Sequence, residues 1–599
     1  MTRNGKVPAL AILAVLTAAA GVGALCAGRY VVSVRDVFHV IVSRWVPMEP
    51  TWGPTVEKVV LLIRLPRLAA ALLVGSCLAV SGATYQSIFK NQLAAPELLG
   101  VFQGSCVGAA AAILLGAGSF FVQASALCGG ILSVVVATLI TRFFRSDSSA
   151  ILVLSGVIVS GVMRSVLGML KYAMDTETQL PSITYWELGS LSDMTFQKLL
   201  PVLPGMAVAM AVLFAMRWQF NLLSLGDGEA RSLGVNVAAV RGVTVACATM
   251  LTSCAVCLSG TIAWVGLVIP LLRKARCRSR QREADADRGP HGGPFPGRRR
   301  YRRALPRGGG DPPEHPHGAR RSPHLHHHAV PAEAEREMSV LEVREASFAY
   351  GRREVFHDVS FSLRQGQVLS VIGPNGSGKS TLLNCLAGLL RPRTGEIFLD
   401  GRSQRALRAR DIAKIVGYVP QNQAFVYGYT VRDFVVMGRA PYIGVLAKPG
   451  RRDYEMADAA IEAMGIAHLS GSPCTEISGG ERQQASIARV MVQSPRVVMM
   501  DEPTSALDFG NQMRVIGMIR RLASEGYAVI MTTHTPDHAI MLNDTVALLD
   551  RSGALRVGGT DEILREGLLS EVYRTDVRMV YVKEVGRMAC LASNPDARP

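Results

Sequence analysis

The sequence has few aromatic residues and no cysteine spacing that indicates a disulfide framework. Aromatic residues make up 6% of the 599 residues, although 49% are hydrophobic and the mean hydropathy is +0.24. The eleven cysteines are scattered, and Cys77, Cys106 and Cys247 stand inside apolar runs. Such cysteines are typical of buried thiols in a reducing compartment, which excludes a small disulfide-bonded secreted domain. The composition indicates a membrane protein with a soluble part.

Acidic residues are scarce relative to basic ones, with 47 Asp and Glu against 64 Lys and Arg and a formal net charge of +17. Residues 273–336 hold 16 basic and 7 acidic residues, and so supply +9 of that charge. A nucleic-acid-binding segment needs a folded basic surface or interleaved aromatic residues, and neither is visible here. We therefore expect no nucleic-acid partner. The mild basic excess elsewhere is typical of cytoplasmic loops between membrane helices.

Long apolar runs rich in Gly, Ala and Ser fill the first 272 residues. The first run, at 7–27, follows Arg3 and Lys6 like a signal peptide, but its length and the runs behind it favour a retained membrane helix. Small residues let such helices approach closely. Residues 1–272 therefore predict a polytopic all-α transmembrane domain. Further spans are expected at 65–83, 99–116, 120–140, 151–170, 199–216 and 238–258, and an eighth begins near Thr261 and stops at about Leu272.

One cysteine pair, Cys254 and Cys257, has the C-x-x-C spacing of some metal and redox sites. The pair stands in an apolar run that predicts a helix. We therefore favour two buried core thiols over a metal or redox role.

Residues 273–337 are rich in Arg, Pro, Gly and His and have almost no apolar periodicity. This composition predicts a disordered linker between two domains. An anionic-lipid or nucleic-acid patch and a metal site are alternatives. The histidines that a metal site would use are His315, His317, His324, His326, His327 and His328.

A frameshift explains the same segment better. With suitable synonymous codons and a shift of one base, residues 311–335 can encode an apolar helix that ends in positive charge. The same shift lets the codons of Met338 and Ser339 hold an overlapping stop codon. We hypothesise that a single-base insertion or deletion near Pro270 merged two adjacent genes.

From Met338 the sequence predicts an α/β domain, residues 338–599. Strands are expected from the alternation in LEVREASFAY and VFHDVSFSL, and buried parallel strands from QVLSVIG and VVMMDEP. Between QVLSVI and the helix STLLNCLAGLL stands a G-x-x-x-x-G-K-S/T loop, in the context required of a phosphate-binding loop. We expect its backbone N–H groups to meet phosphate, Lys379 to reach the β- and γ-oxygens, and Ser380 to ligate Mg²⁺. The predicted ATP-binding loop residues are Gly373, Pro374, Asn375, Gly376, Ser377, Gly378, Lys379, Ser380 and Thr381.

Two acids end the second apolar strand, VVMMDEP. Asp501 suits Mg²⁺ coordination, and Glu502 suits polarisation of the attacking water. A helix cap is the alternative, which the spacing from the phosphate loop disfavours. The domain is therefore expected to hydrolyse ATP with Mg²⁺.

The segment Ile477-Ser478-Gly479-Gly480-Glu481-Arg482-Gln483 resembles the signature motif of ABC transporter ATPases, with Glu481 in place of the usual glutamine. By this resemblance, two cassettes face each other, and Ser478, Gly479 and Gly480 cap the ATP held by the other one. The resemblance covers nearly all of residues 339–583. It also assigns Gln421 to the Q-loop, where it serves catalysis and Mg²⁺, Asp508 to the D-loop, His534 as the switch histidine and Tyr350 to adenine stacking.

The membrane half resembles the permeases of iron-siderophore, haem and cobalamin importers. The resemblance lies in RLPRLAAALLVGSCLAVSGATYQSIFKNQLAAPELLGVFQG at 64–104, LLSLGDGEARSLGVN at 222–236 and GTIAWVGLVIP at 260–270. It implies that residues 222–236 are a cytoplasmic coupling loop that docks on the ATPase. The final two helices of that family are missing here, and the shifted frame restores an apolar segment where the last belongs.

Together the two resemblances imply a multi-pass protein of the cytoplasmic (inner) membrane that imports an iron chelate by alternating access, with its ATPase in the cytoplasm. They imply a homodimer or a second permease and ATPase pair, and a separate extracytoplasmic substrate-binding protein. The expected cargo is a small-molecule metal chelate, with haem, cobalamin and molybdate as alternatives. A second hypothesis is an ABC ATPase tethered to a broken permease that does not transport.

Overall fold

The computed structural model describes residues 3–47, 49, 52–89, 91, 94–144, 149–262, 264–268, 339–421, 428–505 and 507–593. The segment 273–337 lies outside the described residues, and so do residues 263 and 269–272 of the eighth apolar run. The linker and frameshift hypotheses remain predictions from the sequence.

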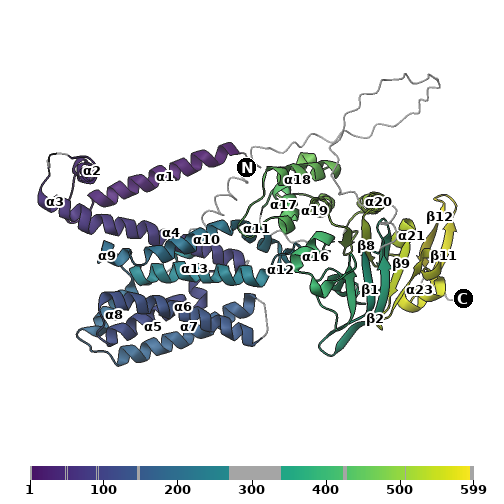
Figure 1. The fold of residues 1–599 in the computed structure, drawn as a ribbon, viewed down its shortest axis with the longest axis horizontal. Coiled ribbons are helices and arrows are strands. Elements are labelled where there is room, and N and C mark those ends of the chain that lie inside the picture. The colour runs from purple at the N-terminus through teal and green to yellow at the C-terminus, as the bar shows by residue number, and fades with distance from the viewer. Residues whose placement is uncertain are drawn as a thin grey trace, which may run out of the picture. The chain divides into compact units, whose positions relative to one another are not determined.

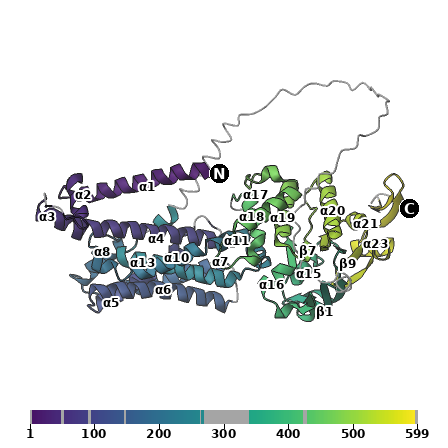
Figure 2. The ribbon, with the colours of Figure 1, turned by 45° about the horizontal axis from the view of Figure 1, so that its top comes forward.

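All seven complete apolar runs are helical, as predicted. In Figures 1 and 2, α4, α10 and α13 lie side by side, and so do α5 and α6. The helices are α1 (Arg3–Cys26), α4 (Leu65–Phe89), α5 (Val101–Leu114), α6 (Ser119–Phe143), α7 (Ser149–Tyr172), α10 (Leu203–Ala215) and α13 (Val237–Ser259). Shorter helices between them are α2 (Val34–Val42), α3 (Pro54–Lys58), η1 (Val59–Arg64), η2 (Pro96–Leu99), α8 (Gln179–Leu188), α9 (Phe196–Leu199), α11 (Arg217–Leu225) and α12 (Asp227–Ser232).

Not every predicted run forms a full span. Within the described residues, four helices are long and apolar enough to cross a membrane, and α10 with α11 makes a fifth if that pair, bent by 53°, counts as one. The predicted span at 199–216 is interrupted at residues 200–202, between α9 and α10. Helix α5 has 14 residues, about 21 Å, against a hydrocarbon core of about 30 Å. It is shorter than the run 99–116 because Gly100, at φ 78°, separates it from η2.

Small residues let α5 and α6 touch, as the sequence indicates. A Cβ atom on Gly104 would lie 2.4 Å from the carbonyl oxygen of Gly129, and one on Gly108 would lie 2.0 Å from that of Ser125. Larger side chains at these positions would push the two helices apart.

The C-x-x-C pair lies inside the helical bundle. Cys254 and Cys257 are 1% and 2% exposed, and the Cys257 thiol donates to the Cys254 carbonyl at 3.2 Å. The described residues hold no group of three or more His, Cys, Asp or Glu side chains able to bind a metal. The prediction of core thiols is confirmed.

The second half contains two sheets and a hairpin. One sheet is antiparallel in the order β2-β1-β4-β5, and the other has the order β10-β9-β3-β8-β7-β6. Strands β6, β7, β8, β3 and β9 of the larger sheet run parallel. The strands are β1 (Leu341–Tyr350), β2 (Arg353–Leu363), β3 (Val368–Ile372), β4 (Thr394–Leu399), β5 (Arg402–Ser403), β6 (Val416–Val419), β7 (Val497–Met500), β8 (Ala528–Thr533), β9 (Thr545–Leu549), β10 (Leu555–Gly559), β11 (Val577–Val582) and β12 (Arg587–Ala592).

Strands β3, β7 and β8 are buried along their whole length, which confirms the prediction of buried parallel strands. Carboxyl ends of parallel strands meet at one edge of the sheet, where such folds place their sites. Gly373, Asp501 and His534 therefore share one edge. The helices of this half are α15 (Lys379–Leu386), α16 (Ala409–Ile415), α17 (Val431–Val436), α18 (Arg451–Ala463), α19 (Gly479–Gln493), α20 (Phe509–Ser524), α21 (Pro536–Leu542), α22 (Thr560–Ile563) and α23 (Glu566–Tyr573).

Candidate nucleotide site and coupling contacts

The loop between β3 and α15 requires glycine at two positions. Gly373 and Gly378 have φ of +155° and +105°. A Cβ atom on Gly373 would lie 2.3 Å from the Leu549 carbonyl oxygen, and one on Gly378 would lie 2.6 Å from the Val355 side chain. The loop leads directly into the N-terminus of α15, whose free N–H groups favour anions. The Ser377 hydroxyl is buried there and has no hydrogen-bond partner among the described residues.

Lys379, at the start of α15, is 5% exposed. Its amine donates to the carbonyl oxygens of Gly373 and Pro374 at 2.8 and 3.1 Å, and lies 3.8 Å from Glu502 Oε1. Burial lowers the pKa of this amine, and the nearby Glu502 and Asp501 oppose that shift. The lysine is thus held over the loop beside the two acids.

Asp501 is 4% exposed and is held by three hydroxyl groups. Its Oδ1 accepts from Ser380 Oγ at 3.1 Å and from Thr532 Oγ1 at 2.7 Å, while the Tyr418 hydroxyl donates to Oδ2 at 3.4 Å. Burial is the main cause that raises the pKa of Tyr418, with Asp501 adding to it. Sequence reasoning missed Tyr418 and Thr532, although Thr532 stands in the MTTH segment just before His534.

Glu502 is the centre of a second set of contacts. Its Oε2 accepts from Gln421 Nε2 at 2.7 Å and lies 3.5 Å from His534 Nδ1. Its backbone has φ of 44°, a conformation uncommon outside glycine, and its N–H donates to Thr532 Oγ1 at 2.8 Å. The structure therefore brings together Lys379, Ser380, Gln421, Asp501, Glu502 and His534.

The oxygen atoms around Asp501 fit a magnesium ion. Mg²⁺ prefers oxygen ligands at about 2.1 Å in an octahedron, which puts neighbouring ligand oxygens about 3.0 Å apart. Ser380 Oγ and Asp501 Oδ1 are 3.1 Å apart. Gln421 directs its amide nitrogen to Glu502, which leaves its carbonyl oxygen for a cation.

The signature residues form a different group of contacts. Ser478 caps α19 in a capping box, with its hydroxyl and N–H donating to Glu481 Oε2 at 2.7 and 2.8 Å. These hydrogen bonds lower the pKa of Glu481. A Cβ atom on Gly480 would lie 3.0 Å from the Asn511 side chain, and Asp508 accepts from the Asn511 N–H at 2.8 Å.

Tyr350 stands at the end of β1 and is 54% exposed. Its ring packs edge-on against Phe348 with centroids 4.9 Å apart, and Phe348 in turn stacks on Phe356. The site residues thus lie in three groups, which are the acid and lysine cluster, the capped end of α19 and one exposed ring.

Residues 222–236 contain two short helices, α11 and α12, and they contact the ATPase half as the resemblance implies. Glu229 Oε2 of α12 accepts from Arg489 Nη1 of α19 at 2.8 Å, with side chains 11% and 1% exposed. The Arg489 guanidinium also lies 4.9 Å from the centre of the Phe434 ring. This buried ion pair joins residues that are 260 positions apart in the sequence, and no sequence motif predicts it.

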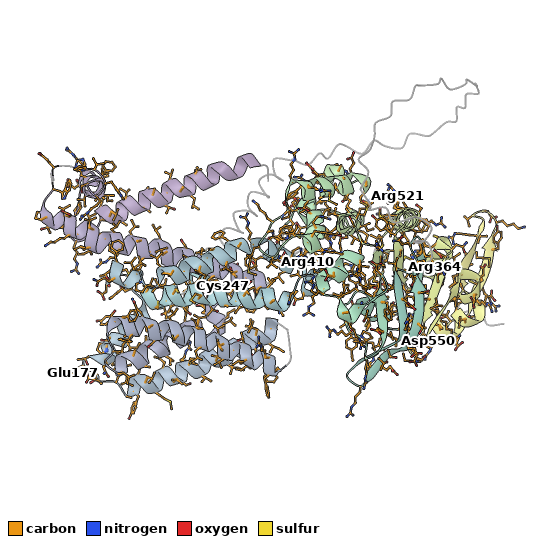
Figure 3. All side chains as sticks on the ribbon, in the orientation of Figure 1. Glu177, Cys247, Arg364, Arg410, Arg521 and Asp550 are labelled. Atoms are coloured by element: carbon orange, nitrogen blue, oxygen red, sulfur yellow. The ribbon has the colours of Figure 1, made fainter. Side chains whose placement is uncertain are left out.

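Other contacts surround that pair. Ser224 Oγ and the Tyr429 hydroxyl are 2.9 Å apart, and a Cβ atom on Gly234 would lie 2.6 Å from Arg410 Cα. Arg410 is in α16, which contacts α12. It is labelled in Figure 3. Apolar side chains complete the contact, with Leu222, Leu223, Ala230 and Leu233 in one buried cluster with Val419, Phe434, Val435 and Ile487.

Comparisons with known proteins found similar proteins for each half of the chain. The FecCD transport family matches residues 13–284, and the ABC transporter family matches residues 356–505. The chain is 34% identical over 248 residues to an uncharacterised ABC transporter ATP-binding protein of Haemophilus influenzae, which covers 41% of this chain and 94% of that protein. It is 35% identical over 265 residues to the molybdate import system permease protein MolB of the same organism, which covers 44% of this chain and 77% of that one.

A third relative is the iron(3+)-hydroxamate import ATP-binding protein FhuC of Bacillus subtilis, 29% identical over 42% of this chain and 95% of that protein. A solved structure of a metal-chelate type ABC transporter in an inward-facing conformation is 32% identical, covering 43% of this chain and 99% of its own, with a TM-score of 0.39. The chain therefore belongs to the ABC transporters, and in it a multi-pass FecCD-type permease is joined to an ATPase that binds and hydrolyses ATP.

Proposed function

We propose that this chain imports an iron chelate across the cytoplasmic membrane and couples that import to ATP hydrolysis by alternating access. The observation that carries the proposal is the buried Glu229–Arg489 pair, because it joins a helix of the permease to the helix that begins at the signature residues. The relatives that favour iron are FhuC and a Helicobacter pylori protein named as a probable iron chelatin transport ATP-binding protein.

We assign hydrolysis to the cluster at the sheet edge. Glu502 accepts the proton of the attacking water, and Gln421 and His534 hold its carboxylate in place. Lys379 and the N–H groups of residues 373–381 bind the phosphates of ATP. Ser380, Gln421 and Asp501 hold Mg²⁺, which neutralises phosphate charge when bound. Tyr350 stacks on adenine.

The signature residues at the N-terminus of α19 support the proposal of a second cassette. Ser478, Gly479, Gly480 and Asp508 are apart from the acid cluster and offer a helix N-terminus, which attracts phosphate. We therefore assign them to the ATP of a facing chain, in a homodimer or with a second permease and ATPase pair. A separate extracytoplasmic binding protein delivers the chelate, and the ATPase half, residues 338–599, lies in the cytoplasm.

A test of the nucleotide site is Lys379→Ala in the full-length chain. Removing the buried ammonium should weaken ATP binding by about tenfold or more, because a charged group bound to phosphate contributes about 1.5–3 kcal/mol. Titration of a fluorescent ATP analogue measures this. Lys448→Ala, at an exposed loop position, is the matched control. Equal affinity of the Lys379 variant and the parent would contradict the assigned role.

Molybdate is the second candidate cargo, and one observation favours it. The permease half resembles MolB, and the ATPase half is 34% identical over 235 residues to the molybdate import ATP-binding protein MolC of the same organism. Uptake of labelled iron hydroxamate and of labelled molybdate into proteoliposomes, each with its binding protein, separates the two. Uptake of molybdate alone would refute the iron proposal.

The alternative to transport is an active ATPase on a permease that lacks its last helices. It follows from the composition of residues 273–337, within which residues 311–335 can encode an apolar run in a frame shifted by one base, and it takes residues 1–272 as a truncated permease domain. Sequencing the gene tests this alternative. An uninterrupted frame with no shifted apolar alternative would refute the frameshift, whereas a shifted apolar frame followed by overlapping stop and start codons would establish it.

A further inference from the structure

Arg164 is a charged residue deep inside a membrane helix. It belongs to α7, whose span, Ala150–Tyr172, has 23 residues. At about 1.5 Å per residue, Arg164 is about 21 Å from the start of this span and about 12 Å from its end. A hydrocarbon core of about 30 Å then leaves it about 10 Å inside the nearer boundary. Its Cα–Cβ bond tilts toward the N-terminus of α7, away from that boundary. A guanidinium at this depth needs a partner or water.

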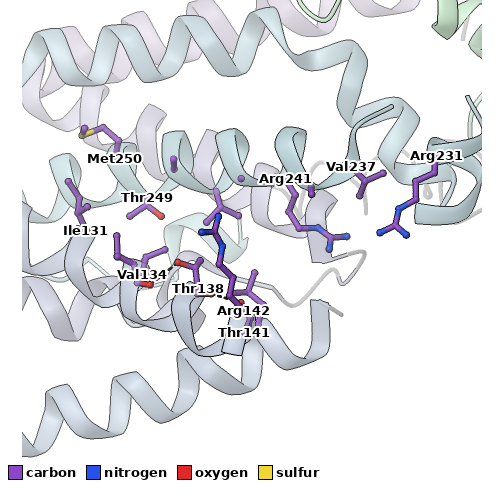
Figure 4. A pocket seen from close by; sticks show the side chains of 16 residues that line it. Ile131, Val134, Thr138, Thr141, Arg142, Arg231, Val237, Arg241, Thr249 and Met250 are labelled. Atoms are coloured by element: carbon purple, nitrogen blue, oxygen red, sulfur yellow. Dashed lines mark hydrogen bonds between the residues drawn. The ribbon is translucent and has the colours of Figure 1, made fainter. Parts of the chain in front are cut away.

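Within the described part of the chain, Arg164 makes no hydrogen bond or ion pair, and its side chain is exposed. The other charged residue of α7, Lys171, pairs with Glu187 near the end of the helix. A cavity of about 780 Å³ lies between α6 and α13 (Figure 4), and its lining includes Leu152 of α7 but not Arg164. Arg164 is therefore on the outer surface of the described bundle.

The surface of α7 around Arg164 is open. Val157, Gly161, Arg164 and Gly168 follow one another at spacings of four, three and four residues, so they form one stripe along the helix. Val157 is 53% exposed, and a Cβ atom on Gly161 or Gly168 would meet nothing from another element within 4 Å. The buried side of α7 packs against α5 and α6 instead. The stripe thus leaves free space along the helix on both sides of the guanidinium.

Arg164 lies in the half of α7 that is farther from the ATPase. Helix α13 begins just after α12, which contacts the ATPase, and it ends at Ser259, whose carbonyl accepts from the Ser190 N–H. Lys171, near the end of α7, pairs with Glu187 of α8, three residues before Ser190. The ends of α7 and α13 are therefore on the same side of the membrane, away from the coupling contact.

Lipid and a second permease are the two surfaces that this stripe can meet outside its own chain. Lipid would leave the guanidinium without a partner in hydrocarbon. In a symmetric pair of permeases the same stripe would be present on both copies, so two Arg164 side chains would face each other. Two guanidinium groups repel at short range, and water or an anion between them removes the conflict. Charged residues inside membrane proteins commonly line such water-filled substrate pathways.

We propose that α7 lines a water-filled path between two copies of the permease, and that Arg164 selects anionic cargo in the half of this path farther from the ATPase. The inference rests on the proposed import function, because it takes the second permease as the facing wall. The two copies give the path two positive charges. These charges attract a molybdate dianion or a metal chelate of net negative charge, and they give no advantage to a neutral chelate.

Thiol labelling of the full-length chain in liposomes tests whether the stripe meets water. The exposed Ser165, next to Arg164, is changed to cysteine. Reaction with an anionic and with a cationic methanethiosulfonate reagent is followed on the peptides that cover position 165. Adding Arg164→Gln to Ser165→Cys should lower the ratio of the anionic to the cationic rate about tenfold, since a unit charge about 6 Å away changes each rate about threefold, in opposite directions. Arg164→Lys should keep the ratio. Arg44→Gln is the matched control, because Arg44 is an exposed arginine that pairs with Glu57.

Uptake into proteoliposomes tests the selection of cargo. Molybdate and a neutral ferric hydroxamate are compared, each with its binding protein. Arg164→Gln should lower kcat/KM for molybdate by about tenfold and change that for the neutral chelate by less than about twofold, and Arg164→Lys should restore molybdate uptake.

Three results would overturn the inference. They are no labelling at position 165, which would place the stripe in lipid, a labelling ratio that does not depend on Arg164, and equal loss or no loss of both cargoes in Arg164→Gln. A parent chain that imports neither cargo would contradict the proposed function. In that case the labelling ratio still decides whether α7 faces water under the charge of Arg164.

Discussion

At the scale of single residues, the most informative side chain is Glu502, because it touches three other members of the cluster. It lies near Lys379, Gln421 and His534, and its own backbone adopts a positive φ. An uncommon backbone conformation at an acid held from several sides is a feature of functional sites.

We expect Glu502→Gln to stop turnover and preserve ATP binding. The amide keeps a hydrogen-bond acceptor for Gln421 but cannot take a proton, so the rate should fall by about 10²–10⁴-fold. Phosphate release under multiple turnover measures the rate. Glu525→Gln is a control, because Glu525 follows the last turn of α20 and pairs with Arg521 on the surface. Sustained hydrolysis by the Glu502 variant would contradict the role of general base.

Protonation of His538 is expected to make the stability of the folded protein depend on pH. It is 5% exposed, with Nδ1 3.3 Å from the hydroxyls of Thr504 and Thr533. Burial lowers its pKa from the ordinary 6.5, His534 adds to that shift, and Asp537 opposes it. Because the folded state resists protonation, the unfolded state gains a proton first as pH falls below 6.5.

The stability that His538 contributes is therefore fully present above its unfolded pKa and is lost as pH falls toward its folded pKa. We expect thermal unfolding of the parent in detergent to occur at a lower temperature at about pH 5.5 than at about pH 7.5. His538→Gln should reduce this difference, and the exposed His357→Gln should not. An identical pH dependence in the His538 variant and the parent would disprove the assignment.

The sequence alone predicts the residues that stand in contiguous motifs and misses those that join them. Gly373, Lys379 and Asp501 follow from spacing and from their place after buried strands. Thr532 and Tyr418, which hold Asp501, come from β8 and β6 and become neighbours only when the parallel sheet forms. The sequence around a hydroxyl side chain at the end of a strand does not indicate which residue that hydroxyl will contact.

At the scale of elements, helix identity is easier to predict than helix length. Apolar runs locate α6, α7 and α13 to within a few residues, because nothing interrupts them. The run at 99–116 is shortened by the left-handed Gly100, and the run at 199–216 is broken before α10. Hydropathy averages over such backbone changes and so does not detect them.

Helix α12 is the element that we expect to transmit force. Glu229→Gln should leave Arg489, which is 1% exposed, without its carboxylate, and breaking a buried pair costs about 3–5 kcal/mol. We predict that hydrolysis continues while cargo moved per ATP falls. The ratio of uptake to phosphate release in proteoliposomes measures this. Glu177→Gln, an exposed loop position (Figure 3), is the control, and an unchanged ratio would argue against coupling through this pair.

At the scale of the whole molecule, the separate groups of site residues predict that two chains share each site. We consider a mixed dimer in which one chain carries Glu502→Gln and the other carries Gly479→Asp. If the signature residues act across the interface, both substitutions fall in the same nucleotide site and the other site is intact. Each variant should be inactive as a homodimer, whereas the mixed dimer, isolated through two affinity tags, should hydrolyse ATP. An inactive mixed dimer would mean that the signature residues serve the ATP of their own chain.

The contact between α12 and α19 lies within a single polypeptide. Tethered partners meet at an effective concentration that can reach the millimolar range, so even a weakened contact re-forms after it opens. Dilution therefore does not separate permease from ATPase in this chain as it can in a complex of free subunits. A mutation that weakens the contact should therefore lower the amount of cargo moved per ATP. The ratio of permease to ATPase stays one to one, because both are parts of the same chain.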